Sequence, residues 1–266
     1  MIKDITIGQY FPGESLLHTS DPRTKIILTL VFMVAVFMAA TYIGFLVISI
    51  FTLIIIISSN IPIRYTLKGL KPVLIIILFT AVINIFSTKG TPIYDVGLFH
   101  YITYEGIDIT IKMALRLSLL IIGASMLTLT TTPILLTDAV EKLMGPAKRI
   151  GVPVHEIAMM MTIALRFIPT LLEETDKIMK AQSARGADFD TGNIVQRAKS
   201  FVPVLVPLFI SAFRRADELA TAMEARCYRG SEGRTRMKQL RFTKVDIIIS
   251  IIMLIFLAML LMVNLN

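Results

Sequence analysis

Two short sequences that share a pattern around an arginine lie 41 residues apart in this chain. They are "AQSARGADF" and "AMEARCYRG", and both contain Ala-x-x-Ala-Arg followed by a small residue. The arginines are Arg185 and Arg226. A planar guanidinium can make a bidentate pair with a carboxylate, and the flanking alanines leave a helix end narrow enough to enter a groove. The pattern therefore offers recognition of acidic grooves by two separate ends.

The same residues also have a plainer interpretation. Arginine is favoured near a helix C-terminus and glycine just after it, so a single "Ala-Arg-Gly" predicts a helix end and no more. Three observations favour docking: the pattern recurs at the ends of two successive predicted helices, both copies lie in one basic segment, and both helix ends are slim. The candidate docking residues are Ala184, Arg185, Gly186, Ala225, Arg226 and Cys227.

Motifs of the common enzyme classes are absent from the sequence. It has no G-x-x-x-x-G-K-[ST] loop for nucleotide phosphates and no Gly-x-Ser-x-Gly elbow. "HEIAM", which starts at His155, begins like a zinc-protease motif but lacks the second histidine. Glu173 and Glu174 are typical of a solvated helix face. The single cysteine, Cys227, excludes an internal disulfide. We expect no catalytic residues, no metal ligands and no cofactor.

The composition predicts an all-α protein that crosses a membrane several times. The mean hydropathy is +0.74, and only 17% of the residues are charged, against about 25% in soluble domains. The first apolar run, residues 26–59, holds 34 residues without a charge. As one helix it would be about 50 Å long, whereas the hydrocarbon core is about 30 Å thick. We therefore predict two spans here, with a turn near "AATYIG".

Three further spans are predicted: one after Pro72, one over about 109–129 and one over 245–263. Residues 131–244 hold 18 of the 27 Lys and Arg residues, and the connection between the third and fourth spans is acidic in balance. Because basic segments stay on the cytoplasmic side, about five spans place the N-terminus and residues 131–244 inside and the C-terminus outside. This topology explains the net charge of +8 better than nucleic-acid binding does. Arg116, in the fourth span, is expected either to snorkel or to face the bundle.

The chain thus divides into residues 1–130 with four spans, 131–244 as a cytoplasmic or interfacial domain, and 245–266 with the last span. Apolar residues recur at helical spacing in 157–178 and 205–223, and their continuous runs are too short to span a membrane. We predict three amphipathic helices in this domain, a shorter one over about 134–150 and two long ones that end at the arginine motifs. The soft side chains of Met159, Met160 and Met161 suit either core packing or a grip on a changing membrane partner.

Three short stretches of the sequence carry a resemblance to one family, and this resemblance covers nearly the whole chain. They are "DPRTKI" (21–26), "ALRFIPTLLEETDKIMKAQSARGADF" (164–189) and "AMEARCYRG" (222–230). The chain resembles the transmembrane T component of energy-coupling factor (ECF) transporters of bacterial membranes. The resemblance implies a non-enzymatic scaffold whose long coupling helices end in two arginine tripeptides, each docked in a groove of one of two ABC-type ATPases. The second tripeptide departs from the family by holding Cys227 where glycine is usual, which makes a left-handed helix cap there less certain.

The resemblance further implies a small membrane-embedded substrate-binding subunit, the S component, which takes up a vitamin or a metal ion. The scaffold would carry the motion of the ATPase pair to that subunit, with Met159 to Met161 in the gripping face. The inequality of Gly186 and Cys227 hints at two different ATPases. A self-contained secondary transporter or channel with a basic regulatory domain is the alternative, although its spans would contain few ionisable residues. The substrate is not encoded in this chain.

Overall fold

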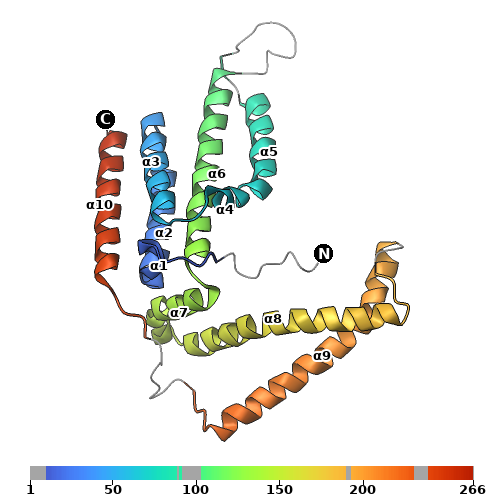
Figure 1. The fold of residues 1–266 in the computed structure, drawn as a ribbon. Helices are drawn as coiled ribbons and strands as arrows, with labels where there is room; N and C mark the ends of the chain where they lie inside the picture. The colour runs from blue at the N-terminus through green and yellow to red at the C-terminus, as the bar shows by residue number, and fades with distance from the viewer. Residues whose placement is uncertain (1–9, 89, 92–102, 190–192, 231–238, 266) are drawn as a thin grey trace. The chain divides into compact units, whose positions relative to one another are not determined.

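The computed structural model describes residues 10–88, 90–91, 103–189, 193–230 and 239–265, and every regular element in these ranges is a helix (Figure 1). The all-α prediction is confirmed. The chain divides into two compact units. In the described part of the chain, the first, which we call the membrane unit, lies within residues 10–139 and 239–265, and the second, the coupling unit, lies within residues 140–189 and 193–230.

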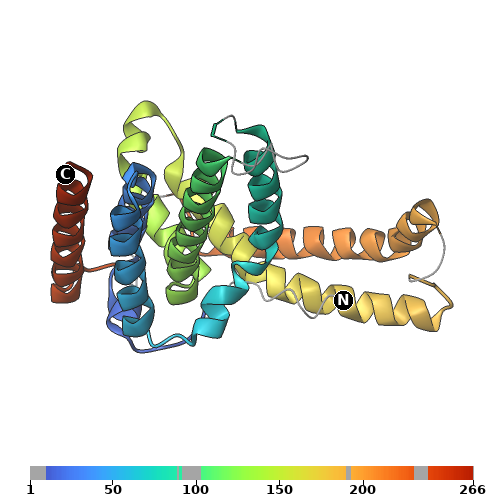
Figure 2. The same ribbon diagram turned by 90° about the horizontal axis from the view of Figure 1, so that it is seen from above.

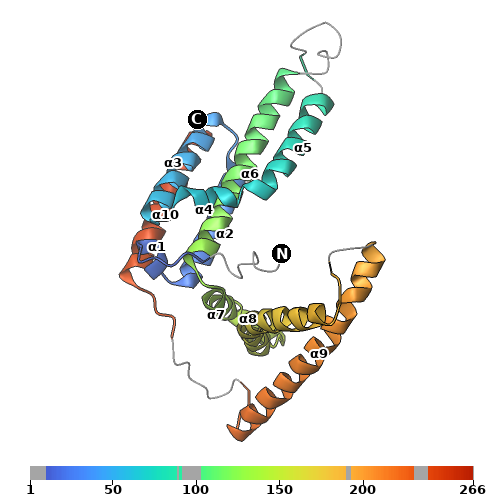
Figure 3. The ribbon, with the colours of Figure 1, turned by 45° about the vertical axis from the view of Figure 1, so that its right-hand side comes forward.

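Seven helices lie within the described part of the membrane unit. They are α1 (Leu16–Thr19), α2 (Pro22–Met38), α3 (Tyr42–Ser58), α4 (Ile63–Lys68), α5 (Lys71–Ser87), α6 (Tyr104–Thr130) and α10 (Lys244–Leu265). Seen from above, α10, the α2–α3 pair, α6 and α5 follow one another across this unit (Figure 2). Helix α5 runs beside α6 in every view (Figure 3).

The long apolar run 26–59 forms two helices, as its length predicts. Asp21 caps α2, because its Oδ1 accepts the Arg23 N–H at 2.8 Å, and Pro22 occupies the first turn. Helix α2 ends at Met38, and Thr41 caps α3 by accepting the N–H of Gly44 at 3.2 Å. Each helix has 17 residues, or about 25 Å. The predicted turn near "AATYIG" is confirmed.

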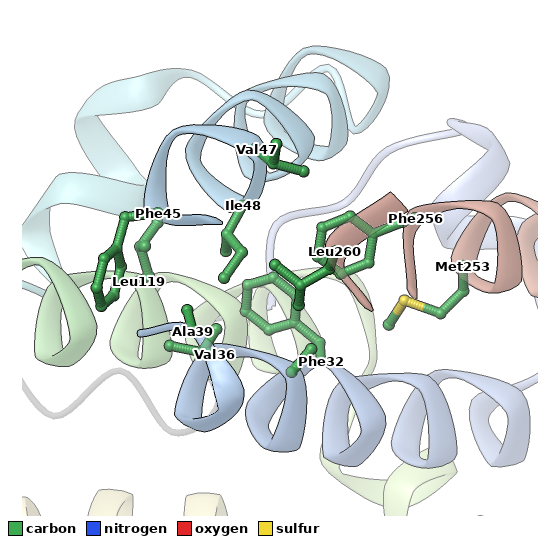
Figure 4. Packing of buried hydrophobic residues seen from close by; sticks show 11 residues of the cluster. Phe32, Val36, Ala39, Phe45, Val47, Ile48, Leu119, Met253, Phe256 and Leu260 are labelled. Atoms are coloured by element: carbon green, nitrogen blue, oxygen red, sulfur yellow. The ribbon is translucent and has the colours of Figure 1, made fainter. Parts of the chain in front are cut away.

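One buried apolar cluster joins four helices of the membrane unit (Figure 4). The side chains come from α2 and the residue after it, α3, α6 and α10: Phe32, Ala35, Val36, Ala39, Phe45, Val47, Ile48, Leu119, Met253, Phe256 and Leu260. At one side of the cluster the rings of Phe51 and Phe256 stack with centroids 4.0 Å apart. Helix α5 has no buried residue and packs on α6. The four-helix cluster is therefore the packed centre of this unit.

Three described helices are long and apolar enough to cross a membrane, namely α6, α8 (Val154–Ala184) and α10, while α3 and α5 are shorter apolar helices. Helices α6 and α10 correspond to the fourth and fifth predicted spans. Helix α8 differs from the expectation that the basic segment holds no element of spanning length. Its run "IAMMMTIAL" is short, but the helix continues without a break for 31 residues, so an 18-residue apolar window fits inside it. The count of five spans and the domain limits stay predictions.

The coupling unit is built on two long helices, α8 and α9 (Ile194–Ala225). The predicted shorter helix is an α-helix, α7 (Pro133–Leu143), which begins in the membrane unit, followed by a 3-10 turn, Gly145–Ile150. Glu174 of α8 accepts hydrogen bonds from Ser211 and, at 3.1 Å, from Nη2 of Arg215 of α9. Pro203 and Pro207 lie inside α9, which bends in Figure 1.

Candidate partner-docking site

Arg185 is the C-cap of α8, directly after the last helical residue, Ala184, and the chain leaves the helix there. The N–H of Gly186 donates to the carbonyl of Ser183, and the N–H of Ala187 donates to that of Gln182, both at 3.0 Å. Gly186 has a φ of +90°. These two reversed bonds around a left-handed residue are a Schellman cap. The motif therefore ends the helix and places the arginine directly after its last turn.

Arg226 ends α9 in the same way. The N–H of Cys227 donates to the carbonyl of Glu224 at 2.8 Å, and the N–H of Tyr228 donates to that of Met223 at 3.0 Å. Cys227 takes the left-handed position with a φ of +54°. A side chain there costs about 1–2 kcal/mol relative to glycine. Cys227, which stands where glycine is usual in the family, therefore leaves the geometry of the second cap intact.

Both motifs are open to solvent. The six candidate residues Ala184, Arg185, Gly186, Ala225, Arg226 and Cys227 are all exposed. A Cβ added at Gly186 would meet no atom within 4 Å. In the part of the chain that the structure describes, neither Arg185 nor Arg226 forms an ion pair. Each guanidinium is thus free to pair with an incoming carboxylate at the end of a slim helix.

The two motifs lie at different places within the coupling unit. Helices α8 and α9 pack against each other and run in opposite directions, so their C-terminal ends lie far apart at opposite ends of the pair (Figure 1). A single acidic groove could not receive both ends. The arrangement suits two grooves, each of which receives one helix end.

His155 connects three elements of the coupling unit. Its Nδ1 lies 3.1 Å from Oε1 of Glu141 in α7, and its Nε2 lies 3.4 Å from the hydroxyl oxygen of Tyr228, two residues after Arg226. The histidine that resembles the start of a zinc motif in the sequence therefore joins the start of α8 to the chain after α9. This contact helps to fix the chain that follows the second arginine motif.

The methionine run lies partly on an outer face of α8. Met160 and Met161 are exposed, whereas Met159 is half-buried. Sequence reasoning missed a second apolar face, on α9, where Val202, Val206, Phe209, Ile210 and Phe213 are all at least half exposed. The helical spacing of these residues, mostly three to four positions apart, could have indicated this face. It was missed because the packed face of this half of α9 is also apolar, so the sequence does not show which face is exposed.

Arg116 of α6 faces the bundle. Its Nη2 donates to the carbonyl of Ala39 at 2.9 Å, and its guanidinium carbon lies 5.9 Å from the ring centres of Phe37 and Phe45. The arginine thus binds a carbonyl at the end of α2, where helix carbonyls lack partners of their own. Of the two alternatives left open by the sequence, the structure favours the second, with a structural contact at the α2–α3 turn.

Comparison with known proteins identifies the family of the chain. Residues 13–237 match the CbiQ family, described as "Cobalt transport protein". This matched range includes "DPRTKI" and both arginine motifs. The chain belongs to the CbiQ family. As a member, it is a membrane component of a transporter.

Several curated relatives of this CbiQ-family chain carry the name "Energy-coupling factor transporter transmembrane protein EcfT". The chain is 70% identical to that of Ruminiclostridium cellulolyticum over 96% of both chains. It is 59% identical to that of Thermosediminibacter oceani over 92% of both, and 49% identical to that of Bacillus subtilis over 96% of this chain and 97% of the relative. The resemblance inferred from the three sequence motifs is confirmed.

Proposed function

We propose that the chain is the scaffold of an ECF-type importer, with no catalytic residues of its own. It would join two ATPase subunits to a small membrane-embedded S component that binds a vitamin or a metal ion. The observation that carries this proposal is the pair of matching ends: two Schellman-capped, exposed arginines at the ends of two long helices. The names of the relatives support an ECF transporter.

In this mechanism the arginine ends stay anchored while the ATPases close on ATP and open after hydrolysis. Arg185 and Arg226 would each pair with an acid in the groove of one ATPase. Long helices held together by the contacts between Glu174 and Arg215 would carry the displacement as shifts of whole elements. The exposed apolar residues of α8 and α9 would bind the S component. The difference between Gly186 and Cys227 favours two non-identical ATPases.

The basic segment is the part that we assign to the cytoplasm. The N-terminus and residues 131–244 would lie inside and the C-terminus outside, after about five spans. Helix α8 would lie along the membrane surface despite its length, because both arginine ends must reach soluble ATPases and its last turns carry Lys177 and Lys180.

A tagged chain, purified gently in detergent from its native cells, tests the scaffold function. Mass spectrometry should find two ATPase subunits and one small membrane protein with it. The alternative function, a self-contained secondary transporter or channel, predicts a chain that purifies alone. Transport by that lone chain in liposomes without ATP would overturn the scaffold proposal.

Chemical labelling of the single cysteine tests two points: the side of the membrane on which the second motif lies, and its docking to an ATPase. Cys227 is the only thiol in the chain and is exposed in the second motif. A membrane-impermeant maleimide should therefore label it in inside-out vesicles but not in intact cells. Bound ATPases should slow this labelling by about tenfold or more, because docking buries the motif. The comparison is made in the same vesicles before and after the ATPases are stripped.

The matching control places a thiol on the opposite side. Tyr104→Cys in a Cys227→Ser background puts an exposed cysteine at the start of α6, where the topology predicts the outside. It should be labelled in intact cells. Labelling of Cys227 in intact cells would reverse the assigned orientation, and equal labelling with and without ATPases would contradict docking at this end.

A further inference from the structure

A buried ammonium holds the end of α6. Lys25 of α2 is 8% exposed, and its Nζ donates to the carbonyls of His18 at 3.4 Å and Thr130 at 3.1 Å and to the hydroxyl of Thr131 at 3.2 Å. Three donors thus meet three acceptors. Two of the acceptors lie at the C-terminal end of α6, where carbonyls lack partners and positive charge is favourable. Lys25 therefore acts as a cap for a helix about one hundred residues away in the sequence.

A buried carboxylate holds the start of α10. Asp246 is 3% exposed. Its Oδ1 accepts the N–H of Asp21 at 2.7 Å, and its Oδ2 accepts the N–H and hydroxyl of Thr243 at 2.6 and 2.9 Å. The side chain thus caps its own helix and binds the residue that caps α2. The starts of α2 and α10 are joined by one side chain.

Arg23 adds a second contact to the chain before α10. Its guanidinium binds the carboxylate of Asp21 with two bonds, of 3.1 and 2.7 Å, and its Nη2 reaches the carbonyl of Leu240 at 3.3 Å. It also lies 4.2 Å from the ring centre of Phe242. Burial raises the pKa of Asp21, but the side-chain and backbone hydrogen bonds from Arg23 outweigh it, so the pKa lies below its ordinary value. The carboxylate stays charged and paired.

These contacts occur where the chain passes between the units. The chain leaves the membrane unit through α7, which begins two residues after Thr131, and returns to it at Gln239. The short segment 21–25 therefore holds both the exit, through Lys25, and the return, through Asp21 and Arg23. We call this segment and Asp246 the helix-end cluster.

Polar contacts matter here because apolar packing is interrupted beside the cluster. An open pocket of about 200 Å³ is lined mainly by apolar side chains of α1, α2, α3, α6 and α10, and Lys25, Thr130 and Val245 are among its lining residues. Around such a pocket the neighbouring helices make fewer dispersion contacts with one another. The ends of α2, α6 and α10 at this side are thus held by the charged hydrogen bonds of the cluster.

We propose that the helix-end cluster is the anchor through which displacement of the coupling unit moves the membrane unit. The inference rests on the proposed scaffold function. A load on either connection would otherwise unwind the last turn of α6 or the first turn of α10, because terminal turns have the fewest backbone bonds. With both connections tied to one segment of α2, the load moves α2, α6 and α10 together. Loss of the anchor would leave ATP hydrolysis running without transport.

Lys25→Met tests this anchor in the complete complex. The variant keeps the length and burial of the side chain but removes all three hydrogen bonds. ATPases should copurify in wild-type amounts and hydrolyse ATP, whereas uptake per ATP hydrolysed should fall by about tenfold or more, since charged hydrogen bonds are the strong ones. The uptake probes are a panel of radiolabelled B vitamins and Co²⁺, given to proteoliposomes that contain the complex. The panel member with the largest wild-type uptake is used.

Two further variants keep the test decisive. Asp246→Asn acts on the other connection with little change in shape and should show the same loss of coupling, even where Lys25→Met accumulates poorly. Lys71→Met removes an exposed lysine at the start of α5 and should leave the uptake-to-hydrolysis ratio unchanged. An unchanged ratio in both cluster variants, or uptake that falls only with the amount of assembled complex, would overturn the anchor. A wild-type chain that brings no ATPases would instead reject the scaffold function.

Discussion

The double variant Arg185→Glu, Arg226→Glu is expected to lose the ATPase subunits during purification. Each change places a carboxylate where the proposed grooves present an acid, so attraction becomes repulsion. Breaking one buried, hydrogen-bonded charge pair at an interface costs about 2–5 kcal/mol. Every 1.4 kcal/mol is about tenfold in affinity. Two such losses should therefore reduce copurified ATPase below detection by stained gel or by mass spectrometry.

Single variants should show a smaller loss. When one helix end stays docked, the other ATPase is still held close through its partner ATPase, so the effective concentration of its groove stays high. Because the two ends lie at opposite ends of the α8–α9 pair, one end cannot take the place of the other. Arg185→Glu and Arg226→Glu alone should thus lower the yield of ATPase without abolishing it.

A second double variant tests whether the change in net charge alone causes the loss of ATPase. Arg166→Glu, Lys199→Glu makes the same change in net charge on the same two helices, at exposed positions away from the motifs. It should retain both ATPases. Normal copurification and uptake in the Arg185→Glu, Arg226→Glu variant would reject these ends as docking sites, whereas equal loss in the control variant would point to non-specific electrostatics.

The sequence predicted features that depend on neighbouring residues. The split of 26–59 follows from helix length and the turn residues, and the helix ends at the arginine motifs follow from local capping rules. The left-handed backbone at Cys227 could not be predicted with the same assurance, because it depends on reversed bonds that outweigh the cost of a Cβ.

Features that depend on distant residues stayed hidden. "DPRTKI" was visible only as a family motif, because the partners of Lys25 and Asp21 lie 105 and 225 residues away. No periodic pattern reports such contacts. The contact between His155 and Tyr228 spans 73 residues for the same reason. Local patterns thus predicted the elements and the helix ends at the arginine motifs, whereas the connections between elements required the structure.

Gly123→Val is expected to destabilise the membrane unit strongly. A Cβ at Gly123 of α6 would lie 2.5 Å from Cε1 of Phe32 in α2, far inside van der Waals contact. Phe32 cannot easily yield, because it is 4% exposed and its ring packs beside the stacked pair of Phe51 and Phe256, with centroids 6.3 and 6.4 Å away. Overpacking of this kind costs about 1–3 kcal/mol. The midpoint of thermal unfolding in detergent, followed by the loss of monodisperse protein, should fall.

Three further variants separate the clash with Phe32 from a general intolerance of valine. Gly145→Val is the control, since a Cβ there meets no atom within 4 Å and its backbone is not left-handed, so the midpoint should change little. Phe32→Leu alone should also destabilise, by removing ring contacts. Because the smaller side chain makes room for the valine, the double variant Phe32→Leu, Gly123→Val should lose less than the sum of the single losses. Strict additivity would show that α2 and α6 do not meet at this glycine, and the four-helix core would then need a different arrangement.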